Sequence, residues 1–429
     1  MTVICNLTTI PSRFDKIQPV ITNLYKTGLF DEVVVHIPKE YSRFGKFSYV
    51  PHFTECRVNL VDVDYGPATR IVYGEGDTVV WCDDDTEYKD SDVRFLLRQH
   101  TETGSMCGGS GFNLNKYFQG DFSKTPGMSV QVLEGYGMVV CSKEHVDKIR
   151  EEVMTLSKLT FMDDMIVGNV TEKYNIPKLC FPWEIKQYEY GFGSDALHFN
   201  DGEKTHMHAY KRVLETFRKN NVMYFKPYVS YAIGVCNESL ELDNLLYCLD
   251  KTMIHSDEVV VLIDTKKVTP HVYDVLEKYP WVRFCGRDFD GHFANHKNYL
   301  TSQCKGEYVF NIDADEIPSC GIVENIYRLI KADVIFIPRV NLLPGATQEF
   351  LNECQFSITQ EGFINWPDYQ GRIYKQTLRW EGDLHEKIQG FKTTGQLPAH
   401  AHASLWHVKS VQKMKAQADF YKSLKTSAP

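Results

Sequence analysis

Two acidic clusters are the residues best suited to chemistry in this sequence. DDD at 83–85 follows the apolar run VVWC, and DADE at 313–316 follows YVFNI, so each contains D-x-D directly after a predicted strand. Carboxylates one residue apart repel each other unless a cation, a helix N-terminus or water compensates them. Mg²⁺ and Mn²⁺ prefer such oxygen ligands and keep positions for substrate phosphates. The clusters therefore favour metal-assisted chemistry on a diphosphate leaving group over the alternative, a solvated acidic turn.

Both clusters belong to a long repeat. A strand ending in Cys5-Asn6 has a counterpart ending in Cys236-Asn237, and DEVVV occurs at 31–35 and again at 257–261. The acidic clusters are the third pair, in the same order and at nearly the same spacing. Three collinear pairs predict two similar domains in tandem, which we expect at 1–222 and 223–429.

The elements between these landmarks predict an α/β fold. β-branched runs resemble strands buried on both faces, whereas residues 14–26, 240–252, 270–278 and 204–219 have helical length and periodicity. Strand–helix alternation indicates a mostly parallel sheet in each half, with ligands bound at the carboxyl ends of the strands. The segment 411–425 has the pattern of an amphipathic helix.

Composition narrows the classes of protein. The chain has 429 residues and a net charge of −9, which disfavours general nucleic-acid binding, and no run approaches the 18 apolar residues of a membrane span. The N-terminus lacks a secretory pattern. Sequons start at Asn6, Asn169 and Asn237, and two of them fall at the ends of predicted core strands, where glycans would block folding. We expect a cytoplasmic protein without a transmembrane segment.

The second half resembles glycosyltransferase family 2, whose members have the GT-A (Rossmann-like) fold. The resemblance is carried by Asn237-Glu238, Asp264-Thr265, the run FDGHFANHKNYLTSQCKGEYVFNIDADE and the later RIYKQTLRWEGDLHEKI. It implies an inverting transferase that uses a nucleotide-sugar donor and Mn²⁺ or Mg²⁺. The implied donor-binding residues are Asn237, Glu238, Asp264, Asn298 and Asp313, and the implied metal ligand is Asp315. His407 is a candidate for a further metal ligand or for a structural histidine. Asp368 and Glu386 compete for the role of catalytic base.

The first half is similar to a more divergent GT-A group found in large viruses and algae. The similarity rests on TTIPSR at 8–13, DYGPATR at 64–70 and the DDD cluster, although that group often has lysine at the position of Arg70. The implied donor-binding residues are Thr8, Thr9, Arg13, Tyr65, Thr69, Arg70, Asp83 and Asp84, with Asp85 as a metal ligand. Asp163 and Asp164 are candidates for the base or for a helix N-cap, and His206 or His208 for a further metal ligand or a structural histidine.

The tandem order resembles the multidomain glycosyltransferases of chlorella viruses that build capsid glycan, for which the donor class is UDP-L-rhamnose and the location host cytoplasm. We therefore expect a bifunctional, metal-dependent enzyme that adds successive sugars to a glycan acceptor. One alternative is a single catalytic half beside a degenerate carbohydrate-binding half. The other is a metal-dependent phosphohydrolase, against which the position of both clusters, after the third or a later strand, argues.

Overall fold

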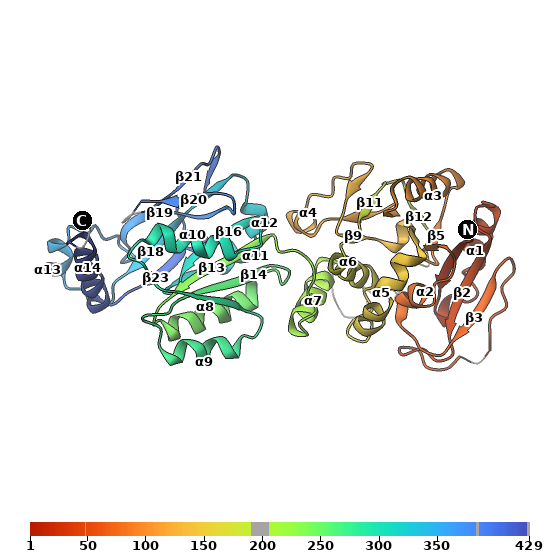
Figure 1. The fold of residues 1–429 in the computed structure, drawn as a ribbon, viewed down its shortest axis with the longest axis horizontal. Coiled ribbons are helices and arrows are strands. Elements are labelled where there is room, and N and C mark those ends of the chain that lie inside the picture. The colour runs from red at the N-terminus through yellow and green to blue at the C-terminus, as the bar shows by residue number, and fades with distance from the viewer. Residues whose placement is uncertain (48, 190–205, 383–385, 427–429) are drawn as a thin grey trace. The chain divides into compact units, whose positions relative to one another are not determined.

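The computed structural model describes residues 1–47, 49–189, 206–382 and 386–426. The chain divides into two compact units, Met1–Phe225 and Lys226–Pro429, and each is described by itself (Figure 1). None of the described helices has both the length and the apolar character that crossing a membrane requires.

The first unit is built on a mixed sheet in the order β3-β2-β1-β4-β10-β6-β11-β8. Strand β1 pairs in parallel with both β2 and β4, whereas β10 runs antiparallel to β4. The strands of this unit are β1 Val3–Thr8, β2 Glu32–Pro38, β3 Arg57–Val61, β4 Thr78–Trp81, β5 Thr86–Glu87, β6 Met106–Gly108, β7 Gly111–Phe112, β8 Met128–Ser129, β9 Val132–Leu133, β10 Val139–Ser142, β11 Lys178–Cys180 and β12 Lys186–Gln187.

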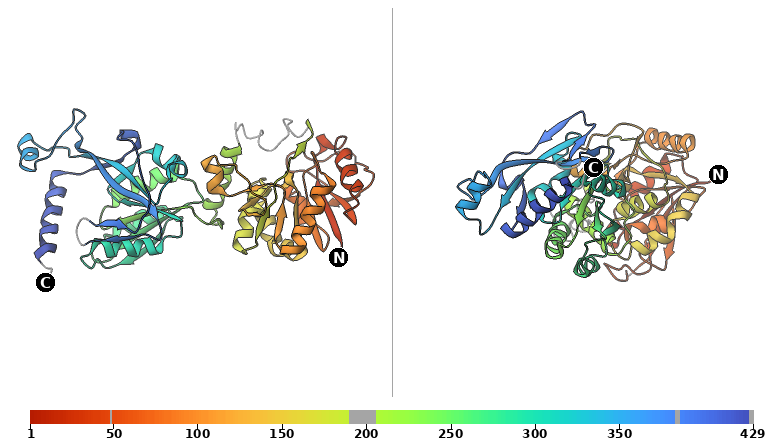
Figure 2. Two further views of the ribbon diagram at one scale, coloured as in Figure 1. Left: turned by 90° about the horizontal axis from the view of Figure 1, so that it is seen from above. Right: turned by 60° about the vertical axis from the view of Figure 1, so that its left-hand side comes forward.

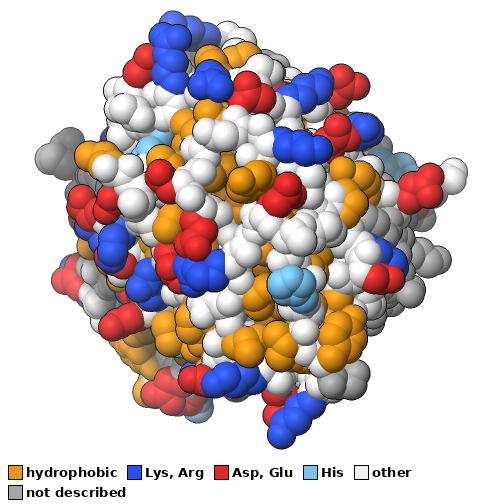
Figure 3. All heavy atoms as spheres, turned by 90° about the vertical axis from the view of Figure 1, so that its right-hand side faces the viewer, with side chains coloured by type: hydrophobic (Ala, Val, Ile, Leu, Met, Phe, Trp, Pro, Cys, Tyr) orange, Lys and Arg blue, Asp and Glu red, His pale blue; other side chains and the backbone are white. Residues whose placement is uncertain are grey.

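Helices connect these strands, and α5 packs against both α2 and α6. The helix expected over 14–26 begins only at Gln18, with Pro19 in its first turn, where a missing N–H costs nothing. The helices, with 3₁₀ turns labelled η, are η1 Pro11–Arg13, α1 Gln18–Lys26, η2 Gly66–Ala68, α2 Thr69–Val72, α3 Asp90–Thr103, α4 Leu114–Gln119, η3 Gly135–Gly137, α5 Lys143–Leu156, α6 Asp163–Lys173 and α7 His206–Lys219. On the face seen in Figure 3, acidic and basic side chains are interspersed among neutral ones.

The second unit has a larger sheet in the order β15-β14-β13-β16-β19-β18-β23-β17, with β22 paired to β18. Helices α8 and α9 cover one face and α10 lies on the other (Figure 1). The strands are β13 Val229–Val235, β14 Glu258–Asp264, β15 Arg283–Arg287, β16 Tyr308–Asp313, β17 Glu316–Pro318, β18 Val334–Leu342, β19 Ile364–Lys375, β20 Arg379–Glu381, β21 Lys387–Gln389, β22 Thr394–Gln396 and β23 Leu405–Val408. The helices are α8 Ser239–Thr252, α9 Pro270–Lys278, α10 Phe293–Gln303, α11 Cys320–Glu324, α12 Ile326–Leu329, α13 Gln348–Glu353, η5 Ala401–Ala403 and α14 Val411–Thr426.

The two sheets share one topology over their first four strands. The order β3-β2-β1-β4 in the first unit is repeated as β15-β14-β13-β16 in the second, parallel throughout, and an antiparallel strand follows in each. The expected α/β class with a Rossmann-like sheet in each half is confirmed. Strand order reverses beside β1 and beside β13, and open α/β sheets bind ligands at such switch points. Each acidic cluster follows the strand next to that point.

Two sequon asparagines are structural residues inside the first unit. The Asn6 amide donates to the carbonyl oxygens of Ile4, Glu75 and Val80, and Asn169 accepts from the backbone N–H groups of Tyr224 and Phe225. Both asparagines are fully buried. A glycan on either one would have to displace these bonds and the surrounding core.

Asn6 also binds a buried histidine, which should make the stability of the first unit depend on pH. His36 Nε2 lies 2.9 Å from Asn6 Oδ1, and its Nδ1 lies 3.0 Å from the Asn59 amide. Burial, assisted by the charge of Arg57, lowers the pKa of His36 from 6.5 to about 4. The folded state therefore binds fewer protons than the unfolded state between these two pH values. Stability contributed by neutral His36 is complete above pH 6.5 and is lost as pH falls toward 4.

We expect urea unfolding to report this loss as about 3 kcal/mol between pH 7 and pH 4. His36→Gln, which keeps a donor and an acceptor but does not titrate, should be less stable at pH 7 and should lack this part of the pH dependence. Parallel stability curves for wild type and His36→Gln over this range would contradict the assignment.

Candidate functional site

Each unit has a cavity at the strand ends that carry its acidic cluster. The first cavity has a volume of about 250 Å³ and the second about 1230 Å³. Pockets for small molecules typically measure roughly 300–1,000 Å³. The second cavity therefore has room for a nucleotide-sized ligand, whereas the first is close-fitting.

Arg13 anchors the acidic cluster of the first unit. It belongs to η1, directly after β1, and its Nη1 lies 2.6 Å from Asp84 Oδ1 and 3.2 Å from Asp85 Oδ2. The Thr9 hydroxyl donates to the other oxygen of Asp84 at 2.5 Å. Thr8 lines the same cavity. The structure thus brings the TTIPSR opening and the DDD cluster together.

Arg70 makes a second ion-pair centre in this cavity. Its Nη1 donates to Asp83 at 2.5 Å and to the Cys82 carbonyl at 2.7 Å, and its Nη2 lies 2.9 Å from Asp163 Oδ2. The guanidinium passes so close to Gly135 that a Cβ there would collide with it. Arg70 therefore links α2, the acidic cluster and the start of α6.

Negative charge is in excess around this cavity. Burial, with repulsion from Asp83 and Asp84, raises the pKa of Asp85 to about 7. Burial also raises the pKa of Asp164 well above its usual value, and the charges of Asp163 and Asp83 add to this shift. A cation bound here would offset the repulsion among these carboxylates. The lining carboxylates are Asp64, Asp83, Asp84, Asp85, Glu134, Asp163 and Asp164, and the lining arginines are Arg13, Arg43 and Arg70.

Some residues expected in the first site are placed elsewhere. Thr69 is fully buried and its hydroxyl accepts from the Tyr65 N–H, while Tyr65 packs against Tyr73, so both residues hold the turn before α2. Neither lines the cavity. Of the two histidines that begin α7, His206 lines the cavity and His208 does not.

Glu134 and Tyr136 are lining residues that sequence reasoning missed. Ser110, which lies between β6 and β7 in the sequence Gly108-Gly109-Ser110-Gly111, donates to Glu134 at 2.6 Å and lies 2.9 Å from the Tyr136 hydroxyl. The Lys124 ammonium donates to Ser110 at 2.6 Å. The sequence around Glu134 has no periodicity that would indicate a functional residue. Only the fold therefore places this hydrogen-bond network beside the DDD cluster.

The second cavity begins at the ends of β13 and β14. Glu238 accepts from the backbone N–H groups of Cys236 and Asn237, and Asp264 accepts from those of Lys266 and Phe289. Asn237, Glu238 and Asp264 all line the cavity. The three expected nucleotide-binding residues therefore lie around one space.

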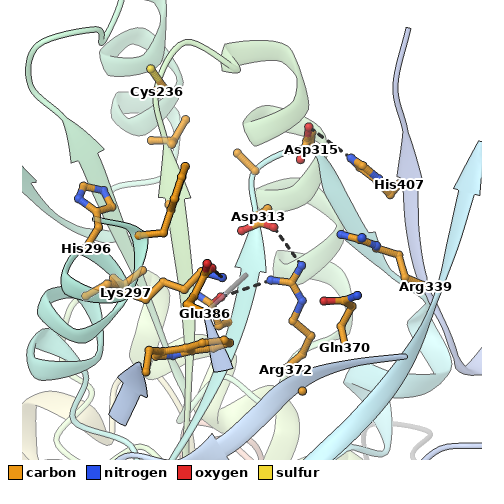
Figure 4. A pocket seen from close by; sticks show the side chains of 18 of the residues that line it. Cys236, His296, Lys297, Asp313, Asp315, Arg339, Gln370, Arg372, Glu386 and His407 are labelled. Carbon is orange, nitrogen blue, oxygen red and sulfur yellow. Dashed lines mark hydrogen bonds and ion pairs between the residues drawn. The ribbon is translucent and has the colours of Figure 1, made fainter. Parts of the chain in front are cut away.

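A buried carboxylate orders the acidic cluster of this unit. Glu316 is fully buried, and its Oε1 accepts from Arg372 at 2.6 Å and from Arg339 at 3.0 Å. Its Oε2 accepts from the Asp313 N–H, and Arg372 also contacts the Asp313 carboxylate at 2.9 Å (Figure 4). Although burial acts to raise it, the charges of Arg372 and Lys297 hold the pKa of Asp313 well below its usual range.

Asp315 faces a group of cations. His407 Nε2 lies 3.5 Å from its carboxylate (Figure 4), the Lys413 ammonium 3.3 Å and the Lys409 ammonium 3.7 Å. Burial opposes these contacts, but the hydrogen bond and charge of His407, with that of Lys409, keep the pKa of Asp315 lowered. The expected pairing of Asp315 and His407 in one site is present in the geometry, whereas the lysines were not anticipated.

The two candidates for the base in this unit occupy different environments. Asp368 accepts from Arg339 at 2.7 Å, from Asn341 at 3.0 Å and from Gln370 at 2.6 Å, and it does not line the cavity. Glu386 does line it and pairs with Lys297 at 2.6 Å (Figure 4). Burial acts to raise the pKa of Asp368, but the charge of Arg339 and the hydrogen bonds from Asn341, Arg339 and Gln370 outweigh it and lower that pKa.

Asn298 has a task different from the expected contact with nucleotide. Its amide donates to the Trp380 carbonyl and accepts from the Trp380 N–H, each at 2.8 Å. Asn298 does not line the cavity, whereas its neighbour Lys297 does. It therefore joins α10 to β20 and positions Trp380, because both ends of its side chain are already bonded.

The residues fit a divalent metal only together with a phosphate ligand. Among the described residues, no three histidine, cysteine or acidic side chains are grouped closely enough to hold a metal by themselves. Mg²⁺ is usually held by one or two carboxylates plus substrate phosphates and water. The excess carboxylates around Asp85 suit such a cation. At Asp315, a divalent cation would have to replace the Lys413 ammonium as the partner of the carboxylate.

No protein-family model matches the sequence, and no curated protein matches it. Solved structures similar to the chain include S. aureus TarS 1-349 in complex with UDP-GlcNAc, at 17% identity and a TM-score of 0.30, covering 42% of this chain and 58% of that one. Another is the mannosyltransferase PcManGT from Pyrobaculum calidifontis in complex with GDP-Man and Mn²⁺, at 19% identity and a TM-score of 0.22, covering 30% and 38%. The chain thus spans less than two thirds of either structure, and likeness at this level assigns no activity to it.

Proposed function

We propose that the chain is a glycosyltransferase in which each unit transfers a sugar from a nucleotide-diphosphate donor to a hydroxyl group of a glycan. The observation that carries the proposal is the repeated placement of D-x-D. Each cluster follows the strand beside the switch point of a sheet with the same strand order, and each borders a cavity. That position is where open α/β folds hold a nucleotide.

In the second unit, Asn237, Glu238 and Asp264 border the nucleoside and the acidic cluster borders the diphosphate. Asp315, with His407, would hold the metal, which neutralises charge developing on the leaving diphosphate. Glu386 takes the proton from the acceptor hydroxyl while the oxygen of that hydroxyl bonds to the anomeric carbon of the donor sugar. The bond from that carbon to the diphosphate oxygen breaks, and the nucleoside diphosphate leaves with its electron pair. Attack opposite the leaving group inverts the anomeric centre.

In the first unit, Arg13 and Thr9 orient Asp84, and Arg70 orients Asp83 and Asp163. Asp85 is the candidate metal ligand, with His206 at the cavity wall. Asp163 and Asp164 both line the cavity and are the candidates for the base. A retaining reaction would not need such a base, so the stereochemistry of this unit is left open.

The donor class proposed for the chain is UDP-linked, with UDP-L-rhamnose the sugar nucleotide implied by the resemblance of its tandem order. Two sites on one chain would add successive sugars to one glycan, because tethering raises the effective concentration of the first product at the second site. Mn²⁺ or Mg²⁺ is the proposed cofactor.

Thermal shift with UDP-, GDP- and dTDP-sugars in the presence of Mn²⁺ tests the donor class. A ligand that binds only the folded state raises the melting temperature, so UDP-sugars should stabilise wild type. Asp85→Asn should lose this effect in the first unit and Asp315→Asn in the second. Stabilisation by GDP-sugars alone would contradict the proposed donor.

Product analysis with the same two variants separates the alternatives. If both units transfer sugar in succession, the variant in the unit that acts first should lose both products, and the other variant should lose only the second product. If one unit only binds carbohydrate, its variant should leave every product unchanged. A phosphohydrolase would instead consume the donor equally fast with and without acceptor.

A further inference from the structure

The C-terminal helix α14 supplies a wall of the second cavity. Lys413, Ala416, Gln417 and Phe420 of this helix line the cavity. These positions are spaced at i, i+3, i+4 and i+7, which places them on one face of a helix. Lys415, on another face, is exposed and its ammonium lies 5.1 Å from the Phe350 ring. Helix α14, drawn in dark blue in Figure 2, thus turns the face that carries these four residues to the cavity.

That face has a basic end and an aromatic end. At the basic end, Lys413 lies 3.3 Å from Asp315, 3.4 Å from Glu241 and 4.0 Å from Glu238. Lys409, just before the helix, donates to Gln417 at 2.8 Å and is only 11% exposed. Both ammonium groups therefore lie at the acidic cluster, the point where a diphosphate would be held.

At the aromatic end, Phe420 contacts one residue that follows β14 and one that follows β15. Its ring centroid is 6.4 Å from that of Phe289, and the Lys267 ammonium is 4.1 Å from the Phe420 ring. The Phe289 N–H donates to Asp264. Phe420 is therefore at the Asp264 side of the cavity, two helical turns from Lys413.

The helix forms the wall without filling the cavity. With α14 in place the volume is still about 1230 Å³, above the roughly 300–1,000 Å³ of most ligand pockets. Among the residues that the structure describes, cations also outnumber carboxylates around this cavity, the reverse of the first unit. The lining cations are Lys267, Lys297, Arg339, Arg372, Lys387, Lys409 and Lys413, and the lining carboxylates are Glu238, Asp264, Asp313, Asp315 and Glu386.

We infer that α14 is part of the donor site of the second unit, with Lys409 and Lys413 binding the diphosphate and Phe420 packing against the nucleoside. This inference rests on the proposed function. Ammonium groups facing a cluster of carboxylates exchange those partners for phosphate oxygens when the donor and its cation enter. The exchange keeps both ammonium groups in charge-assisted contacts, because phosphate oxygens replace the Asp315 carboxylate and the cation takes over that carboxylate. Because Lys413 and Phe420 lie on one face of α14, the same helix contacts both the diphosphate and the nucleoside of the donor.

Isothermal titration of the full chain with uridine, UMP and UDP in Mn²⁺ tests this division of labour. UDP binding to the second unit is identified as the component that Asp315→Asn removes, and uridine and UMP binding are compared between each variant and wild type. Lys413→Met should weaken UDP binding about tenfold or more while changing uridine binding little, since one charge-assisted contact to the diphosphate is lost. Phe420→Ala should weaken all three ligands by a similar factor, because all contain the nucleoside.

Two matched variants control for unspecific effects. Lys413→Arg keeps the positive charge and should retain most of the UDP affinity, and Lys415→Met removes a lysine from the other face and should bind like wild type. Unchanged UDP affinity in Lys413→Met would overturn the inference by making α14 a bystander. Tighter binding would overturn it by making the helix a competitor for the site. Wild type that stays folded yet binds no nucleotide would instead remove the proposed function, and the inference with it.

Discussion

Glu386→Gln should lower the kcat of the second unit by about 10²–10⁴, the usual contribution of a positioned general base. Glutamine has nearly the same shape, so donor binding should change little, whereas loss of the ion pair with Lys297 should lower the melting temperature. The variant cannot take the proton from the acceptor hydroxyl, because an amide oxygen is too weak a base. The assay is product formation in an Asp85→Asn background, in which only the second unit turns over.

Asp368→Asn is the matched control for Glu386→Gln. Asp368 is held by Arg339, Asn341 and Gln370 and does not line the cavity, so its loss should act mainly on stability. A much smaller fall in kcat than that of Glu386→Gln is therefore expected. The reverse order of the two variants, with both proteins folded, would assign the base to Asp368.

Arg372→Met should destabilise the second unit by about 3–5 kcal/mol, the usual cost of removing one partner from a buried ion pair. Arg372 is 3% exposed and contacts both Asp313 and the fully buried Glu316. Without it, Glu316 keeps only Arg339 as a cationic partner among its described contacts. Methionine fills part of the volume but cannot compensate the charge. Denaturant unfolding, followed in the second unit, measures the loss.

Arg283→Met on β15 shows what an exposed pair contributes. Arg283 lies 2.8 Å from Glu258, but its side chain is 42% exposed, and such pairs contribute about 0–1 kcal/mol. The two arginine variants should therefore differ severalfold in their effect on the free energy of unfolding. Equal losses would mean that the buried network around Glu316 adds no more stability than an exposed pair.

The opposite charge balance of the two cavities has a consequence for their ligands. Carboxylates are in excess in the first cavity, whereas the second carries an excess of lysine and arginine. Entry of an anionic diphosphate into the first cavity therefore depends more strongly on a bound cation. Removal of divalent metal with EDTA should accordingly weaken UDP binding more in the first unit than in the second, as two-site titration would show.

The sequence by itself determined the repeated strand pattern and the place of each acidic cluster. Both are local properties. β-branched runs predict buried strands, and a turn directly after the strand leaves Asp83 and Asp313 at the carboxyl end of that strand. The order of strands then brought Thr9 and Arg13 to Asp84, since β1 and β4 are neighbours in the sheet. For these residues, closeness followed from sheet topology.

Only the tertiary structure decided which side chains near these strand ends face the cavity. Asn298 and Lys297 are adjacent in sequence, yet one binds the Trp380 backbone and the other lines the cavity, because successive helical residues point in different directions. Asp368 and Glu386 were equivalent as carboxylates until packing gave Asp368 three partners. Lys413 is far from Asp315 in the chain, and no local pattern links a C-terminal helix to an acidic cluster. Long-range packing supplies that contact and with it the charge of the site.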